Sequence, residues 1–373
     1  LKLAQVLAPC PPSALEGSSD HSMAGNVFSP PERIMRDTID WLLDLPQEER
    51  TRMQQANSYT FTVQAPAPWR DGPAVPSSSS SVPPPSPAFV LAAGCTSPVE
   101  ALFRNGLRPA VMNFAHGYNC GGGFEHAGGS QEEAIIRASS VFLSLWPHRR
   151  SDDGPGVLAR GMWIGDYDSK LSRKEPFYPH TNCGGVYSPH VRLVRRIPVP
   201  STPLLPLASW ADAPEFSVLT VAAQDCNRDG PFDPDLLYQK VRTALHMAAS
   251  NGNDAVVLGA FGCGVFRNPP EVVAQAFKTL LEGEFAGAFK VALFTIPDRG
   301  GANLRAFEAA FGAAQPLDAL GALLEVLSLS SAAVGAGAVA GGAAAVKDGD
   351  AADVADDDGN GKSSRCFSGC TCF

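Results

Sequence analysis

The sequence has no excess of positive charge. Its 373 residues contain 29 lysines and arginines against 38 aspartates and glutamates, which gives a net charge of -9 and a pI of about 5.3. A surface that binds nucleic-acid backbones needs clustered Lys and Arg, so general nucleic-acid binding is not expected. An anionic small ligand is not excluded, because a pocket can bind phosphate through backbone N–H groups.

Cysteine pairs with metal-binding or redox spacing are also absent. The nine cysteines are scattered, odd in number and include no CxxC pair. This usage favours a reducing compartment, so we expect an intracellular protein of the cytoplasm or nucleus. The seven histidines are scattered as well, and the acids lack metal-ligand spacing. We therefore expect no metal and no other cofactor.

Strongly hydrophobic runs of membrane-spanning length are lacking. The run from Ala319 to Val346 is long enough, but it contains Glu325 and becomes rich in Ala and Gly, so membrane association is not expected. Residues 370–373 have the shape of a prenylation signal, with Cys366 as a second lipid site; without aliphatic middle residues or a polybasic stretch, coincidence is favoured over lipidation. Because the chain begins with Leu1 rather than Met, we expect it to be a fragment.

Composition divides the chain into three parts. Residues 1–31 mix Pro, Ser and Gly without periodicity, which predicts a disordered tail. Residues 32–314 carry the apolar patterns of a folded domain, interrupted by a Pro/Ser-rich insertion at 71–87. Residues 315–373 form a second tail, first rich in Ala and Gly and then acidic.

Apolar runs alternate with helical patterns between residues 32 and 314. Continuous apolar strands alternating with helices predict an α/β fold with a mainly parallel sheet that is covered on both faces. Tyr59–Val63 is predicted as an edge strand, and Val186–Pro189 as a turn. The other predicted strands are Ala88–Ala93, Ala110–Ala115, Met162–Tyr167, Val191–Val199, Phe216–Ala223, Ala255–Leu258 and Phe289–Ile296.

Two glycine-rich loops each follow a predicted buried strand. Gly121–Gly123 follows one strand, and Gly262-Cys263-Gly264 follows another. Residues without Cβ let the main chain approach a ligand, although a single loop of this kind, taken alone, is more typical of a flexible surface turn. Ligands of α/β sheets lie beyond the carboxyl ends of the strands, so both loops can face one crevice. The second loop reads Gly-x-Gly-x-x-Arg, which fails the dinucleotide fingerprint at its third position.

Cys263, inside the second loop, has two interpretations. A thiol near a helix terminus can be a nucleophile with a lowered pKa. The sequence offers no base for it, so a small structural thiol is the favoured interpretation.

Two adjacent acids open the helix that follows the first loop, and the apolar pattern of this helix continues to Leu145. Glu132 and Glu133 are about 100° apart on a helix, so one side chain can enter a pocket while the other braces the loop or a sugar hydroxyl. Acids in a first helical turn are also ordinary partners of the helix dipole.

The combination is more specific than its parts. Gly-Gly-Gly, seven residues and then Gln-Glu-Glu resemble the signature of the poly(ADP-ribose) glycohydrolases, and the surrounding text resembles the microbial-type catalytic domain of that family, over roughly residues 33 to 312. The segments that carry the resemblance are Val111–Ala115, Gly121–Glu133, Phe177-Tyr178, His180, Val186–Pro189, Val256–Pro269, Phe294–Asp298 and Asn303.

This resemblance implies a macrodomain-like, three-layer α/β/α fold with a mainly parallel mixed sheet. It implies ADP-ribose or poly(ADP-ribose) as the ligand, including ADP-ribose on modified proteins. Glu133 would be the general acid/base, and Glu132 would orient a ribose hydroxyl. The implied substrate-binding residues are Gly121, Gly122 and Gly123 at the terminal ribose and proximal phosphate, Gln131 and Asn119, Gly262, Cys263, Gly264 and Val265 around the diphosphate, and Phe266 near the ribose.

The implied activity is hydrolysis of ribose–ribose O-glycosidic bonds through an oxocarbenium-like transition state. Two alternatives stay open. A non-catalytic ADP-ribose reader would keep the glycine loops and could dispense with Glu133. A related hydrolase would act on mono-ADP-ribosylated protein or nucleic acid.

Overall fold

The computed structural model describes residues 30–53, 57–59, 86–117, 120–124, 129–145, 150–151, 154–155, 178, 183–195, 212–297 and 301–325. The chain divides into two compact units, residues 1–327 and 328–373, and all of the described residues belong to the first. The predicted strand at 162–167 and the cysteines of the C-terminus lie outside the described residues.

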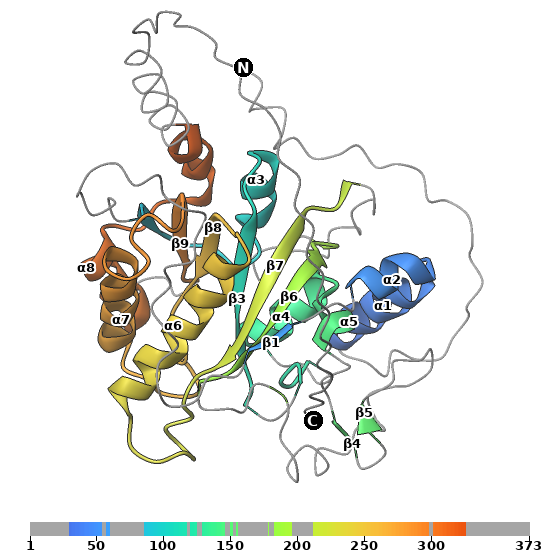
Figure 1. The fold of residues 1–373 in the computed structure, drawn as a ribbon, viewed down its shortest axis with the longest axis horizontal. Helices are drawn as coiled ribbons and strands as arrows, with labels where there is room; N and C mark the ends of the chain where they lie inside the picture. The colour runs from blue at the N-terminus through green and yellow to red at the C-terminus, as the bar shows by residue number, and fades with distance from the viewer. Residues whose placement is uncertain are drawn as a thin grey trace, which may run out of the picture. The chain divides into compact units, whose positions relative to one another are not determined.

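A seven-stranded mixed sheet forms the centre of the first unit (Figure 1), in the order β1-β6-β7-β3-β8-β9-β2. The pairs among β7, β3, β8, β9 and β2 are parallel, while β6 is antiparallel to both β7 and β1. The strands are β1 (Asn57–Tyr59), β2 (Ala88–Leu91), β3 (Pro109–Ala115), β6 (Gly185–Arg192), β7 (Glu215–Ala222), β8 (Ala255–Leu258) and β9 (Val291–Thr295). A separate two-stranded sheet pairs β4 (Arg150–Ser151) with β5 (Gly154–Pro155).

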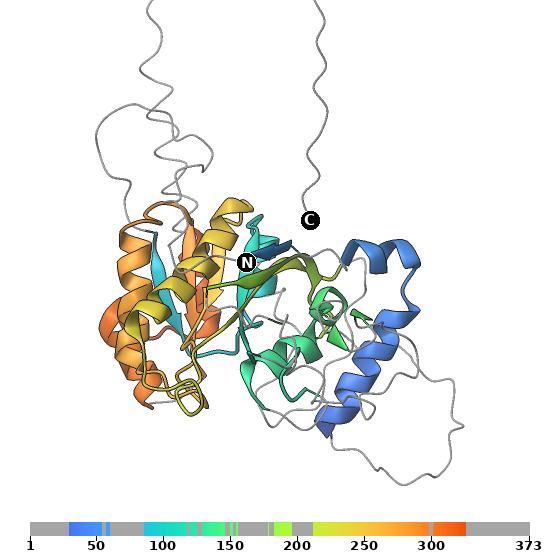
Figure 2. The same cartoon turned by 60° about the horizontal axis from the view of Figure 1, so that its bottom comes forward.

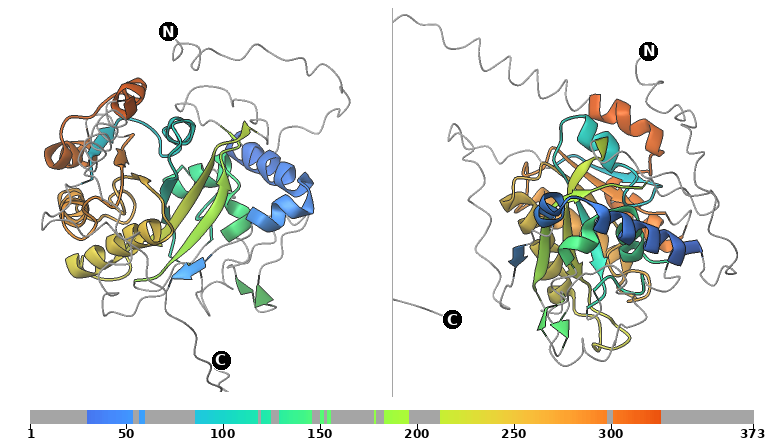
Figure 3. Two further views of the ribbon diagram at one scale, coloured as in Figure 1. Left: turned by 45° about the horizontal axis from the view of Figure 1, so that its top comes forward. Right: turned by 90° about the vertical axis from the view of Figure 1, so that its right-hand side faces the viewer.

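Helices cover both faces of this sheet (Figure 2). One face carries α6 (Pro234–Ser250), α7 (Pro270–Glu282) and α8 (Ala302–Phe311), coloured yellow to orange. The opposite face carries α1 (Pro30–Asp44), α3 (Val99–Arg104), α4 (Gln131–Ala138) and α5 (Val141–Leu145). A short helix, α2 (Gln47–Met53), contacts α5 and β6. Figure 3 shows it beside α1, near the sheet edge formed by β1 and β6.

The strands divide their side chains between two hydrophobic cores. In β3, Val111 packs into the core under α4, whereas Ala110 and Met112 pack into the core under α6 and α7. This period of two is the ordinary alternation of a strand. Because both faces are buried, the strand reads as a continuous apolar run. The predicted three-layer fold with a mainly parallel mixed sheet is confirmed.

Three element boundaries differ from the prediction. The helix expected to continue to Leu145 breaks at Ser139, which is extended and forms a β-bridge to Leu193, so α4 and α5 are separate. Val186–Pro189 is not a turn; it lies in β6, where the register shifts between Ser188 and Val191 beside a proline. The edge strand predicted at Tyr59–Val63 shares only Tyr59 with β1, which lies at the sheet edge, and residues 60–63 lie outside the described residues.

Residues beyond the predicted domain boundary at 314 pack onto this unit. The backbone N–H of Gln315 donates to the Val90 carbonyl at 2.8 Å, and Leu320 and Leu324 are buried in the core under α4. A 3-10 helix at Leu317–Ala319 lies between Gln315 and Leu320. Among the described residues, no helix combines the length and the apolar character needed to cross a membrane.

Candidate active site

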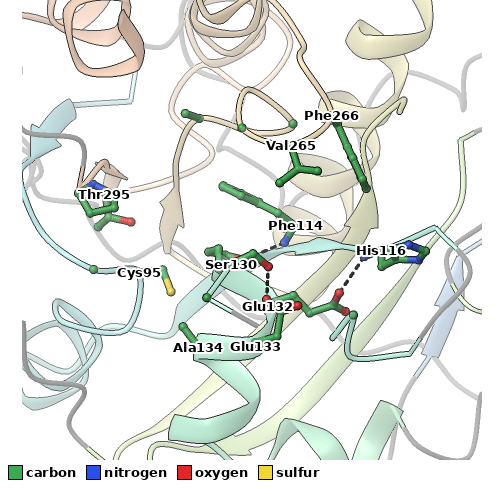
Figure 4. A pocket seen from close by; sticks show the side chains of 18 of the residues that line it. Cys95, Phe114, His116, Ser130, Glu132, Glu133, Ala134, Val265, Phe266 and Thr295 are labelled. Atoms are coloured by element: carbon green, nitrogen blue, oxygen red, sulfur yellow. Dashed lines mark hydrogen bonds between the residues drawn. The ribbon is translucent and has the colours of Figure 1, made fainter. Parts of the chain in front are cut away.

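The two glycine loops and the acid pair line one pocket of about 790 Å³. Figure 4 shows Val265 and Phe266 facing Ser130 and the two glutamates across this pocket. Cys95 and Thr295 lie toward one end of it in that view, and His116 lies toward the other. The predicted meeting of both loops at one crevice is therefore what the structure shows.

The pocket is built at the carboxyl ends of parallel strands, where α/β folds place ligands. Gly94 and Cys95 follow β2, His116 follows β3, the second glycine loop follows β8, and Ile296 and Pro297 follow β9. The remaining lining residues are Phe114, Gly122, Gly123, Gly129, Ser130, Gln131, Glu132, Glu133, Ala134, Ala260, Gly262, Gly264, Val265, Phe266, Thr295 and Asn303.

Glu133 lies in the first turn of α4 and is 6% exposed. Its Oε1 accepts a hydrogen bond from the backbone N–H of Gly123 at 2.8 Å, and its Oε2 accepts one from the hydroxyl of Ser130. Each carboxylate oxygen has two lone pairs, so both keep one acceptor position after these bonds. Glu133 is thus a fixed, largely desolvated carboxyl group at the wall of the pocket.

Glu132 is more deeply enclosed, at 1% exposure. Its Oε2 accepts the backbone N–H of His116 at 2.8 Å, and its Oε1 accepts the hydroxyl of Tyr178 and, at 3.4 Å, the amide of Asn113. Burial raises the pKa of Glu132 from 4.5 to about 8, although the donors Tyr178 and His116 act in the opposite direction. Burial therefore favours the protonated form of Glu132 more than in an exposed glutamate.

Gly122 makes the close approach of loop and acids possible. It has a φ of +61°, a left-handed conformation that glycine adopts without strain. A Cβ at this position would lie 2.7 Å from Oε1 of Glu133 and 2.9 Å from Oε2 of Glu132. The loop thus presses bare backbone against both carboxylates.

Gln131 lines the pocket, yet its polar atoms are already paired with β3. Its Oε1 accepts the Phe114 N–H at 2.9 Å, and its Nε2 donates to the Met112 carbonyl at 2.5 Å. These two bonds clamp the start of α4 to the end of the strand. Gln131 therefore positions the acids from the same first turn of the helix, and its predicted contact with substrate stays a prediction.

The second loop is shaped by Gly262 and Asn268. Gly262 has a φ of +71°, and a Cβ there would lie 2.6 Å from both Ala223 and the Asn268 amide. That buried amide donates to the carbonyls of Gln224 at 2.8 Å and of Gly262 at 3.1 Å. The loop is therefore held in one conformation from beneath.

This conformation leaves three successive N–H groups unused. Those of Gly264, Val265 and Phe266 donate to no acceptor within the described part of the chain. Successive free backbone N–H groups in a glycine turn suit a phosphate or diphosphate. Val265 is 78% exposed, so the loop is also accessible from solvent.

Two predicted binding residues, Cys263 and Gly121, are not among the residues that line the pocket. Cys263 turns its thiol toward the Phe261 carbonyl, 3.6 Å away, and burial raises its pKa to about 12, so it is a structural thiol and not an activated nucleophile. A Cβ on Gly121 would meet Phe124 and Ile136, so this glycine serves packing. Asn119 lies outside the described residues.

The sequence did not single out the groups that hold the two acids. Tyr178 and Asn113 belong to quoted motifs, but nothing local shows that they reach a carboxylate 46 and 19 residues away. His116 contributes its backbone to Glu132, and its ring lies 6.3 Å from that of Phe266. Burial, followed by the charge of Arg228, lowers the pKa of that ring. Ser130 carried a local signal, since Ser130-x-x-Glu133 has the form of a capping box.

Metal ligands do not gather here. Across the residues that the structure describes, no group of three or more His, Cys, Asp or Glu side chains has an arrangement that could hold a metal ion.

A family comparison matches part of the chain. Residues 47–196 match the family model described as the microbial-type PARG catalytic domain. The predicted resemblance is confirmed. The matched PARG segment contains Gly121–Glu133, while the second glycine loop lies beyond it. The comparison with curated proteins gave no match.

Solved PARG structures share the fold. The chain is 22% identical to poly(ADP-ribose) glycohydrolase from Thermomonospora curvata, with a TM-score of 0.54, covering 75% of this chain and 97% of that one. For the same enzyme bound to the inhibitor ADP-HPD, the identity is 22% and the TM-score 0.53, and the match covers 75% of this chain and 97% of that one. For poly(ADP-ribose) glycohydrolase from Deinococcus radiodurans in complex with ADP-ribose, the identity is 24% and the TM-score 0.50, and the match covers 71% of this chain and 97% of that one. At these identities the likeness shows the fold alone.

Proposed function

We propose that this chain is a poly(ADP-ribose) glycohydrolase that hydrolyses ribose–ribose O-glycosidic bonds and releases ADP-ribose. The observation that carries the proposal is the pocket itself: both glycine loops line it, and Glu133 stands in its wall. The volume, about 790 Å³, is in the range of small-molecule and cofactor sites. The family match and the ADP-ribose complex of the Deinococcus radiodurans relative support the same ligand.

The ligand can be placed by its chemistry. The diphosphate would accept hydrogen bonds from the free N–H groups of Gly264 to Phe266. The terminal ribose would then lie between that loop and the acid pair, with Gly122 letting the backbone pass close to the sugar. Cys95 and Thr295 mark the far end of the pocket, where the rest of the nucleotide would extend.

Glu133 would catalyse the cleavage as a general acid and then a general base. Its carboxylic proton passes to the leaving 2′-oxygen as the bond from that oxygen to the anomeric carbon breaks, through an oxocarbenium-like transition state. Water then adds to the anomeric carbon and gives a proton to Glu133, which restores the acid. The products are ADP-ribose and a polymer shortened by the released unit. Such acid–base assistance is typically worth ~10²–10⁴-fold in rate.

Glu132 would contribute orientation and charge control. Because burial raises its pKa to about 8, the neutral form of Glu132 is favoured, which lessens the negative charge that the pocket presents to the diphosphate. Its contacts with Tyr178 and with the His116 backbone fix it beside Glu133, where it can bind a ribose hydroxyl.

Incubation of the purified chain with defined substrates tests the function. Radiolabelled poly(ADP-ribose) and a mono-ADP-ribosylated protein are offered separately, and the products are resolved by chromatography. Release of free ADP-ribose from the polymer supports the proposal. Release from the mono-modified protein alone would favour the related hydrolase, and binding without release from either would favour a reader.

The setting belongs to the same proposal. The polymer would be met on ADP-ribosylated proteins, inside the cell, in the cytoplasm or nucleus. Five free cysteines among the described residues, with no disulfide between them, support a reducing environment.

A further inference from the structure

Ser130 occupies the N-cap of α4 but does not cap it. The residue is extended, with φ -80° and ψ 176°, and no backbone N–H of the helix donates to its side chain. A capping box would have joined the Ser130 hydroxyl to the N–H of Glu133. Asp233, the N-cap of α6, shows the usual arrangement, because its carboxylate accepts from Asp235 at 2.9 Å and from Leu236 at 3.2 Å.

The Ser130 hydroxyl is instead used on the Glu133 carboxylate. It donates to Oε2, while the Gly123 N–H donates to Oε1 at 2.8 Å. Both oxygens are therefore held, one from the glycine loop and one from the helix start. The plane of the carboxyl group is fixed as a result.

The folding of α4 does not depend on this hydroxyl. Gln131 clamps the start of the helix to β3, and Ile135 and Ile136 anchor its buried face. Ser130 itself is exposed and lines the pocket (Figure 4). The Ser130 hydroxyl therefore does not cap the helix. It lies at the pocket wall and contacts Glu133, so its removal should affect catalysis and not folding.

We infer that Ser130 is a positioning residue for Glu133: its hydroxyl holds the carboxyl group in the orientation from which the proton reaches the leaving oxygen. The inference rests on the proposed glycohydrolase function. Without the hydroxyl, one oxygen of Glu133 is released and the carboxyl group samples unproductive orientations. Substrate binding, which depends on the two glycine loops, is unaffected. The rate of the chemical step therefore falls while KM does not change.

Three variants test this role: Ser130→Ala, Ser130→Thr and Asp233→Ala. Loss of the hydrogen bond that orients the catalytic carboxyl group predicts a fall in kcat of about 10- to 100-fold in Ser130→Ala, with KM, ADP-ribose affinity and Tm close to wild type. Ser130→Thr restores kcat, because threonine keeps the hydroxyl and the extended backbone accommodates a β-branched residue. Asp233→Ala gives the opposite pattern, a lower Tm with unchanged kcat, because its cap is real.

The possible failures are distinguishable. An active wild type with a fully active Ser130→Ala overturns the inference and leaves the proposed function standing. A fall in kcat that Ser130→Thr does not restore, or one that accompanies a Tm loss as large as that of Asp233→Ala, also overturns it. An inactive wild type overturns the proposed function and this inference together.

Discussion

Glu132 and Glu133 are neighbours in sequence, but their carboxylates bind different parts of the fold. Glu132 is held by the strand end and by Tyr178, and Glu133 by the first glycine loop and Ser130. The separation follows from the helix, which turns successive side chains about 100° apart. In the proposed function, Glu132 serves structure and orientation, and Glu133 serves proton transfer.

At this residue scale, the charge state of Glu132 predicts a pH dependence of stability. Its pKa is about 8 when folded and near its ordinary 4.5 when unfolded. Between these values the folded state binds more protons, so the free energy of unfolding falls as pH rises from 4.5 to about 8 and no longer changes from this source outside that window. Glu132→Gln removes this contribution.

Urea unfolding at pH 5 and pH 8 checks the prediction. Relative to wild type, Glu132→Gln gains stability at the higher pH. The matched control is Glu271→Gln, an exposed acid in the first turn of α7, which keeps the wild-type difference. If Glu132→Gln showed the same difference in the free energy of unfolding between pH 5 and pH 8 as wild type, burial would not be what raises the pKa of this carboxyl group.

At the scale of elements, the connection from β3 to α4 brings backbone to the acids. Gly122 leaves no room for a Cβ beside the two carboxylates, Gly123 donates to one of them, and Gln131 ties the helix back to the strand. The connection works because its glycines have no side chains.

Gly122→Ala is therefore expected to lower activity at least ~100-fold, since the new Cβ would overlap both carboxylates and move Glu133 out of position. Steady-state release of ADP-ribose from polymer measures the effect. Gly106→Ala is the matched control: its φ of +73° imposes similar backbone strain, but no atom lies within 4 Å of the new Cβ. Equal activity losses in the two variants would assign the effect to strain and not to the acids.

Local patterns predicted much of this element. The apolar run of β3, the glycine loop and the acids of α4 are contiguous in sequence, so their order and spacing could be read directly. The contacts that hold the two carboxyl groups in place could not be predicted from the sequence. Tyr178 reaches Glu132 across 46 residues, and Ser130 has a local pattern that predicts a cap and not a bond to a carboxylate.

At the scale of the whole first unit, two cores on opposite faces of one sheet hold the pocket in place. Alternating apolar strands and helices predicted the layers. The order β1-β6-β7-β3-β8-β9-β2 could not be read from the chain, because it depends on pairings between distant strands. The packing of residues after 314 was also missed, because their composition resembles a low-complexity tail.

Leu320 tests that packing. It is 1% exposed, so Leu320→Ala is expected to lower the free energy of unfolding by about 2–5 kcal/mol through lost burial and a cavity. Leu317→Ala is the control, since Leu317 is 38% exposed three residues earlier, and its loss should stay within about 0.5 kcal/mol. Chemical denaturation of both variants decides. If both variants lost equally little free energy of unfolding, residues after 314 would not contribute to the core, and the predicted domain boundary at 314 would stand.

The most direct test of the account is the activity of Glu133→Gln on poly(ADP-ribose). Glutamine keeps the shape and accepts hydrogen bonds through its carbonyl oxygen, but it cannot donate the proton that the leaving oxygen needs. Release of ADP-ribose should fall at least ~100-fold, while calorimetry shows ADP-ribose binding of wild-type strength. A Glu133→Gln variant that releases ADP-ribose at close to the wild-type rate would contradict the account.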